Sequence, residues 1–221
     1  MNLINISQEE CKLCYSCIRV CPSKAIKVSD GYAEVIHNRC IGCGSCFSVC
    51  SQNAVHYTDS KEEVKFLLKA PGKVAAIVAP SISGEFSDIT DYRSFVSMIK
   101  NLGFAYVNEV SFGVDLMAFQ YEKLFSDFNG KYYITANCPP VVSYIEKYYP
   151  ELVDNLAPII PHMIVTAKVL HEKHGNDLKI VYISPCIAAK NEIKILTDPD
   201  TRIDALLTYI ELRDLFKEFG I

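Results

Sequence analysis

The sequence predicts two unequal folded units: a small cysteine-rich unit over residues 1–59 and a larger α/β domain with a mostly parallel sheet over residues 73–221, joined by residues 60–72. Three observations lead to this division. Eight of the ten cysteines lie between Cys11 and Cys50. Beyond residue 72, short apolar runs alternate with stretches of helical periodicity. The chain of 221 residues is also longer than the roughly 150 residues of a typical single domain.

Composition and charge exclude several classes of protein. Half of the residues are hydrophobic and 22% are charged, as in folded globular chains. A formal net charge of −4 provides no general basic surface, so nucleic acid is not expected as a partner. The longest apolar run, residues 74–79, is too short to span a membrane, and the opening residues do not resemble a signal peptide. We therefore expect a cytoplasmic protein without a membrane span.

The cysteine-rich unit contains one cysteine pattern twice. In each copy two, two and three residues separate successive cysteines, and each cysteine of the second copy lies 29 residues after its counterpart. The two sets are Cys11, Cys14, Cys17 and Cys21, followed by Pro22, and Cys40, Cys43, Cys46 and Cys50. Other positions repeat as well, since Ser16 matches Ser45 and Ala25 matches Ala54. The sequence therefore predicts a duplicated half-module.

Three chemistries can explain such closely spaced cysteines. Disulfides form in oxidising compartments, and nothing in the sequence indicates export. Structural zinc is usually bound by pairs of ligands from separate knuckles. The run C-x2-C-x2-C-x3-C-P is typical of bacterial 4Fe-4S ligation, in which the fourth cysteine binds the other cluster. We therefore expect two 4Fe-4S clusters, either for one-electron transfer or to hold together a unit too small to build a sufficient core.

Over about residues 3–59 the chain resembles a two-cluster bacterial-type ferredoxin, which implies an α+β fold for this unit. The resemblance implies one cluster on Cys11, Cys14, Cys17 and Cys50 and another on Cys40, Cys43, Cys46 and Cys21. Gly42 and Gly44 allow the backbone to turn its amides towards cluster sulfur. Ser51 stands where the second copy would carry proline, which loosens the expected turn but removes no ligand.

Residues 60–72 are predicted to form a connecting helix. Ser60 and Glu63 fit a capping box, in which two side chains satisfy free backbone amides at the helix start. An apolar face follows, and Pro71 and Gly72 end the helix.

The second unit is predicted to alternate between strands and helices. Apolar runs that end in turn residues indicate buried parallel strands beginning at Val74, Phe104, Tyr132 and Ile180, with a final strand over residues 204–209. Helical periodicity with capping or glycine signals indicates helices over residues 92–102, 116–128, 141–149, 163–174 and 208–219. A second capping box, formed by Thr208 and Glu211, is predicted to open the last of these helices. Ligands of such sheets bind beyond the carboxyl ends of the strands.

The two remaining cysteines follow predicted strands. Cys138 precedes two prolines and a predicted helix, and Cys186 precedes IAAKNEI, which can also begin a helix. A thiol at a helix N-terminus tends to ionise, and the thiolate is the form that binds metal. The alternative is that each cysteine is a small apolar filler, the commoner role of a lone buried cysteine.

The sequence around both cysteines resembles the iron-only (diiron) hydrogenase large subunit. TANCPPVVSYIEKYYPELVDNL is similar to the first signature segment of that family and SPCIAAKNE to the second, and SFGVDL, IIPHM and LLTYIELRDLFKEFGI align in order. The resemblance implies that Cys138 and Cys186 help hold the 4Fe-4S cube of the hydrogen-converting cluster and that Glu192 matches a residue of the cofactor site. It identifies residues 73–221 with the first portion of the catalytic domain.

The chain also departs from the family pattern. The family completes its cube with two cysteines of a third, glycine-rich signature, which does not occur before Ile221. Asn137 stands where active members have a proton-relay cysteine, and an amide does not titrate. Ser184 and Ala189 replace a methionine and a lysine that line the diiron site. We therefore assign no catalytic residue, and we expect a hydrogenase-type cluster only if the missing ligands are supplied.

These features predict an iron–sulfur electron-transfer protein that is part of a slow or sensory hydrogenase-like protein, with redox proteins or a downstream signalling domain as partners. The 221 residues alone are expected to be inactive towards hydrogen, as an excised piece or a truncated gene product would be. The alternative is a redox-sensing or scaffold module that acts through partner binding without hydrogen chemistry, recognisable by a partner affinity that changes on cluster reduction. A third alternative is a hydrogenase-like protein of a cluster-assembly pathway.

Overall fold

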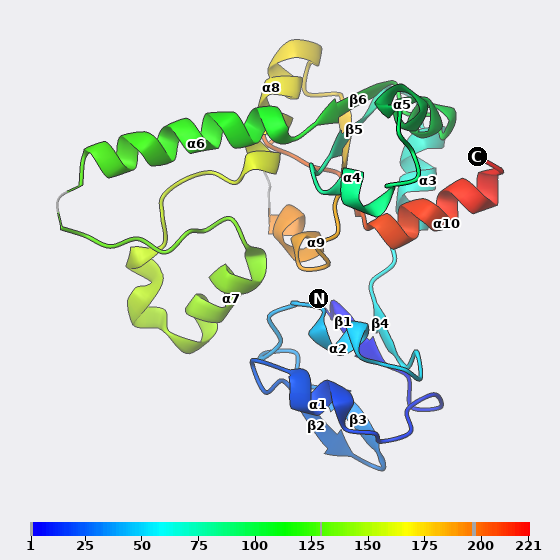
Figure 1. The fold of residues 1–221 in the computed structure, drawn as a ribbon, viewed down its shortest axis with the longest axis vertical. Coiled ribbons are helices and arrows are strands. Elements are labelled where there is room, and N and C mark those ends of the chain that lie inside the picture. Colours follow the sequence, from blue (N-terminus) through cyan, green and yellow to red (C-terminus); the bar gives the residue numbers. More distant parts are fainter. Residues whose placement is uncertain (1, 129, 196–197) are drawn as a thin grey trace. The chain divides into compact units, whose positions relative to one another are not determined.

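The computed structural model describes residues 2–128, 130–195 and 198–221 and divides into two compact units (Figure 1). The first unit contains the described parts of Met1–Thr58, Tyr133–Ala157 and Ile187–Asn191. The second contains the described parts of Asp59–Tyr132, Pro158–Cys186 and Glu192–Ile221. Among these described residues, no helix is both long enough and apolar enough to cross a membrane.

The 29-residue repeat of the sequence is also a repeat of structural elements. In the first unit, β1 (Ile4–Ile6) pairs antiparallel with β4 (Val55–Tyr57), and β2 (Ile26–Ser29) pairs antiparallel with β3 (Tyr32–Val35). Helix α1 (Ser16–Val20) and helix α2 (Ser45–Ser48) carry the third cysteine of each motif. A shift of 29 positions superposes β1 on β3, α1 on α2 and β2 on β4 in the sequence. The two halves therefore share one local fold.

Left-handed backbone conformations repeat with the same period. The six residues concerned are Leu13 (φ 50°), Tyr15 (φ 61°) and Lys24 (φ 50°) in the first half and Gly42 (φ 72°), Gly44 (φ 77°) and Asn53 (φ 53°) in the second. The expected turn of the backbone at Gly42 and Gly44 is therefore present. Non-glycine residues in this region are strained by roughly 1–3 kcal/mol each, a cost that concentrates at functional loops. Both cysteine motifs are held in the same uncommon conformation.

The first unit also contains a later part of the chain. Helix α7 (Pro139–Tyr148) begins after Cys138, and the 3-10 helix η1 (Pro150–Asn155) follows it. The prediction of a strand beginning at Tyr132 is wrong. That segment forms an isolated bridge between Ile134 and Leu156, in which the Ile134 amide donates to Asn155 and the Ala157 amide donates to Ile134. It pairs with the chain just beyond η1 instead of entering the sheet.

The second unit is built on a four-stranded parallel sheet, as predicted. The strand order is β6-β5-β7-β8, formed by β5 (Val74–Val78), β6 (Tyr106–Glu109), β7 (Lys179–Ile183) and β8 (Ala205–Leu207). Residues of β5 lie opposite residues of both neighbours, with Ile77 opposite Asn108 on one side and Tyr182 on the other. All five β5 residues are buried, which fits a central strand.

Helices surround this sheet (Figure 1). They are α3 (Lys61–Lys69), α4 (Ile82–Glu85), α5 (Tyr92–Asn101), α6 (Ser111–Ser126), α8 (His162–His174) and α10 (Tyr209–Phe219). Helix α8 packs on β5 and α6, whereas α3 and α10 pack on β8. The short helix α9 (Ala189–Glu192) and the 3-10 helix η2 (Ile193–Ile195) lie between β7 and β8 in the sequence.

Of the two expected capping boxes, one is confirmed and one is wrong. At the start of α10, the Thr208 hydroxyl accepts a hydrogen bond from the Glu211 amide, and the Glu211 carboxylate accepts one from the Thr208 amide. At the start of α3, the Ser60 side chain makes no capping bond, and the Ser60 amide donates to Glu211 at 2.8 Å. One carboxylate therefore serves both helix starts, and Glu63 is not needed at its predicted place.

Candidate functional site

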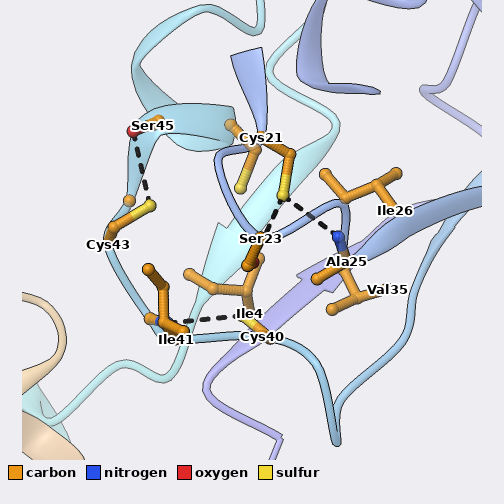
Figure 2. Close-up of a pocket in the computed structure, with 13 residues that line it drawn as sticks. Ile4, Cys21, Ser23, Ala25, Ile26, Val35, Cys40, Ile41, Cys43 and Ser45 are labelled. Carbon is orange, nitrogen blue, oxygen red and sulfur yellow. Dashed lines mark hydrogen bonds between the residues drawn. The ribbon is translucent and has the colours of Figure 1, made fainter. Parts of the chain in front are cut away.

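A small cavity in the first unit brings together cysteines of both motifs (Figure 2). Its lining includes Cys40, Cys43 and Cys46 of the second motif and Cys21 of the first. Apolar side chains complete the wall, namely Ile4, Ala25, Ile26, Val35 and Ile41. Four thiols around one mostly apolar cavity form a donor set that fits a 4Fe-4S cluster, whose ligands are thiolates.

Hydrogen-bond donors are directed at the cysteine sulfur atoms. The Ala25 amide donates to Cys21 Sγ at 3.2 Å, and the Gly42 amide donates to Cys40 Sγ at 3.4 Å (Figure 2). Cys43 Sγ lies 3.3 Å from the Ser45 hydroxyl. Backbone amides around left-handed turns form anion-binding concavities that are common at iron–sulfur sites. The loop is therefore arranged to stabilise negative charge on sulfur.

The first motif shows the same features around Cys11, Cys14 and Cys17. The Ala33 amide donates to Cys11 Sγ at 3.5 Å, and Cys14 Sγ pairs with the Ser16 hydroxyl at 3.5 Å. The Ser16 bond lowers the pKa of Cys14. Cys50 is half-buried and packs against the same core, and its assignment to this set remains a prediction.

Burial raises the pKa of several of these thiols. Burial, followed by the neighbouring thiols Cys40, Cys43 and Cys21, raises the pKa of Cys46 to about 12. Burial also raises the pKa of Cys17, where Cys11 and Cys14 add to the effect. Metal binding requires thiolates and so releases protons. Among the described residues, no group of three or more His, Cys, Asp or Glu side chains is arranged around a single metal ion.

Residues just after Cys186 pack on the second motif. A Cβ atom added to Gly42 would lie 2.8 Å from Leu3 Cδ2 and 3.2 Å from the Ala188 Cβ, and one added to Gly44 would lie 3.0 Å from Ile187 Cδ1. Glycine at both positions therefore leaves room for these side chains and adopts a positive φ without strain.

Helix α7 contributes contacts to the same motif that sequence reasoning missed. Lys147 Nζ donates to the Cys40 carbonyl at 2.6 Å. The Tyr148 hydroxyl lies 2.8 Å from the Ser23 carbonyl and 3.1 Å from the Arg39 carbonyl. No local signal connects α7 with residues more than 100 positions earlier, so these contacts could not be read from spacing.

The remaining candidate ligands lie in different units. Cys138 is exposed at the N-cap of α7 in the first unit. Cys186 is half-buried in the second unit, after β7, where its amide donates to Ser184 Oγ at 3.3 Å. Glu192 ends α9 in that second unit. Their ligand roles remain predictions.

Glu192 is the carboxylate with a strongly shifted pKa. Burial raises its pKa from 4.5 to about 7. A raised carboxyl pKa means that the fold favours the neutral acid, so the contribution of Glu192 to stability is fully present below pH 4.5 and is lost as pH rises through about 7.

Replacing Glu192 by glutamine should remove this pH dependence. We expect Glu192→Gln and the parent to be equally stable near pH 4.5, whereas above pH 7 the variant should be more stable, by at most about 3 kcal/mol because solvent screens a half-buried group. Thermal unfolding midpoints of both proteins across this range test the expectation. A constant difference between them at every pH would contradict it.

Comparison with known proteins gives family matches over both parts of the chain. Residues 72–221 match a family model described as the iron-only hydrogenase large subunit, C-terminal domain. Residues 5–61 match a model described as the LdpA Fe-S cluster-binding domain.

Individual relatives agree with these matches. The chain is 24% identical to the NADP-reducing hydrogenase subunit HndD of Solidesulfovibrio fructosivorans, over 99% of this chain and 37% of the relative. It is 28% identical to iron hydrogenase 1 of Clostridium pasteurianum, over 72% of this chain and 32% of the relative. The chain thus spans roughly a third of the length of each of these curated relatives. A solved apo FeFe-hydrogenase HydA1 from Chlamydomonas reinhardtii superposes with a TM-score of 0.58 at 25% identity, over 74% of this chain and 48% of that chain.

Proposed function

The chain belongs to the iron-only hydrogenase large-subunit family, and on this premise we propose that it is an electron-transfer protein with two 4Fe-4S clusters, forming part of a slow or sensory hydrogenase-like protein. The proposal assigns residues 1–59 to a two-cluster ferredoxin-like domain, residues 60–72 to a connecting helix and residues 73–221 to part of the hydrogenase-like domain. We include a cytoplasmic location, because a reducing compartment keeps thiols available for metal.

The observation that carries the proposal is the cavity lined by Cys21, Cys40, Cys43 and Cys46. Three ligands come from one motif and the fourth from the other, as in the crossed ligation of two-cluster sites. By the repeat, Cys11, Cys14, Cys17 and Cys50 would hold the second cluster. A bound 4Fe-4S cluster carries one electron at a time.

The chain's own residues prepare both sites for this role. Amides of Ala25, Ala33 and Gly42 donate to cysteine sulfur, which stabilises negative charge there. Ile4 and Ile26 are almost fully buried beside Cys21 and exclude water. Hydrogen bonding to sulfur and solvent exclusion are two of the factors that set cluster potentials.

Proton handling supports the slow or sensory part of the proposal. Asn137, directly before Cys138, bears an amide that neither accepts nor releases a proton in the physiological range. Outside the two motifs the sequence contains Cys138 and Cys186, and two thiolates do not complete a four-cysteine cube. A hydrogenase-type cluster at these cysteines and Glu192 would thus need ligands from elsewhere. Redox proteins or a signalling domain are the partners we propose.

Iron and acid-labile sulfide counts on the anaerobically purified chain test the proposal. We expect about eight irons and eight sulfides per chain, because each cube contains four of each. Zinc in place of iron, or about four irons, would contradict two clusters. About twelve irons would show that Cys138 and Cys186 take part in a third cube.

A further inference from the structure

The two motifs differ in where they obtain a cation. In the first motif, the Arg19 guanidinium donates to the Cys14 carbonyl at 3.2 Å and to the Ser16 hydroxyl at 3.4 Å. The repeat counterpart of Arg19 is Ser48, whose hydroxyl donates to the Gly44 carbonyl at 3.5 Å. At the position where the first motif carries a positive charge, the second therefore carries a neutral group.

Helix α7 provides a cation to the second motif from a distant part of the chain. The Lys147 ammonium lies 2.6 Å from the carbonyl of Cys40, one of the four cysteines that line the cavity. The hydroxyl of the next residue, Tyr148, lies within hydrogen-bond distance of two carbonyls beside those cysteines, which fixes this end of α7. They are the carbonyls of Ser23, two positions after Cys21, and of Arg39, directly before Cys40. The lysine is thus held at the backbone of the site.

We propose that Lys147 raises the reduction potential of the cluster bound by Cys21, Cys40, Cys43 and Cys46. An added electron makes the cluster more negative, and a nearby positive charge stabilises that reduced state. Because the charge comes from α7, this potential depends on the docking of a helix outside both cysteine motifs. The inference rests on the proposed pair of clusters.

The test is a redox titration of the full chain, followed by electron paramagnetic resonance. Lys147→Met removes the charge but keeps an unbranched side chain, and it should lower one of the two one-electron midpoints and leave the other unchanged. Lys147→Arg keeps the charge and should leave both midpoints in place. Lys100→Met, at an exposed position of α5 in the second unit, makes the same change in net charge and should also leave both in place.

Salt provides a second measurement that needs no variant. Lys147 is exposed, so its effect is screened as the Debye length falls from about 10 Å at 0.1 M salt to about 3 Å at 1 M. In the parent protein, added salt should therefore lower the midpoint that Lys147→Met lowers.

The outcomes separate this inference from the proposed function. A parent protein with fewer than eight irons would overturn both. Eight irons in parent and variant, with midpoints that Lys147→Met does not move or that Lys100→Met moves equally, would overturn the role of Lys147 alone. If Lys147→Met loses iron, the variant's midpoints are not comparable with the parent's, and the salt titration of the parent decides. Parent midpoints that do not change with salt would then overturn the role of Lys147.

Discussion

A Cys21→Ala variant is expected to lose one whole cluster, and that cluster is the one held by the second motif. Cys21 follows Cys17 by four residues, yet its thiol lines the cavity formed with Cys40, Cys43 and Cys46. It is also 8% exposed, so no other thiol can replace it without rearranging the core of the first unit. Iron should fall from about eight to about four per chain, as measured by iron and sulfide analysis.

Two further variants show which cluster remains. Cys43→Ala removes an exposed cysteine of the second motif, and Cys14→Ala removes its repeat counterpart in the first. With crossed ligation, the reduced Cys21→Ala protein should give the same paramagnetic resonance spectrum as Cys43→Ala and differ from Cys14→Ala. Agreement with Cys14→Ala would show instead that each motif holds its own cluster. Cys138→Ala should retain about eight irons and is the control for loss of an exposed cysteine.

The cysteine sites were accessible to prediction because their information is local. Ligand spacing, the 29-residue repeat and the glycines at 42 and 44 all lie within single motifs, and the structure repeats its elements with the same period. The sheet was predictable for a similar reason, since β5, β7 and β8 are short runs of mostly buried apolar residues, and β6 begins with the half-buried Tyr106 and Val107 after the buried Phe104. Local patterns of this kind report burial directly, whereas the ligand roles of the cysteines stay predictions.

The errors concern contacts between distant residues. The segment at Tyr132 has the composition of a strand, but composition does not specify a partner, and Ile134 bridges Leu156 instead. Ser60 has a suitable sequence for a capping box, yet its amide bonds to Glu211, 151 residues away. No sequence pattern indicated the contact of Lys147 with the Cys40 carbonyl, because the two residues are 107 positions apart. Tertiary context decides such cases, and a single sequence does not contain it in readable form.

Gly113→Ala should produce the largest loss of stability in the second unit. Gly113 lies in the first turn of α6, where the helix packs directly against α8. An added Cβ atom would overlap the His162 carbonyl oxygen and the Thr166 hydroxyl, which are themselves joined by a 2.9 Å hydrogen bond. A backbone carbonyl cannot rotate away as a side chain can, so α6 and α8 must separate. Overpacking of this kind costs about 3 kcal/mol.

A matched control isolates the clash from the general effect of replacing a helical glycine. Gly84 lies in α4, and an added Cβ atom there meets no atom within 4 Å. Gly84→Ala should therefore be neutral or stabilise by up to about 1 kcal/mol, because alanine has less freedom to lose on folding. Thermal midpoints should show Gly113→Ala below the parent by about 6–12 °C and Gly84→Ala at or above it.

Thr166 allows the cause of the loss to be tested. Adding Thr166→Ala to Gly113→Ala removes one of the two overlapping atoms and should recover part of the midpoint, although Thr166→Ala alone removes a hydrogen bond and is expected to destabilise slightly. Such non-additivity is characteristic of residues in direct contact. Strictly additive effects, or a Gly113→Ala protein that unfolds at the parent's temperature, would mean that α6 and α8 do not approach closely at Gly113. The close approach also connects α6 to the sheet, because α8, which carries both His162 and Thr166, packs on β5.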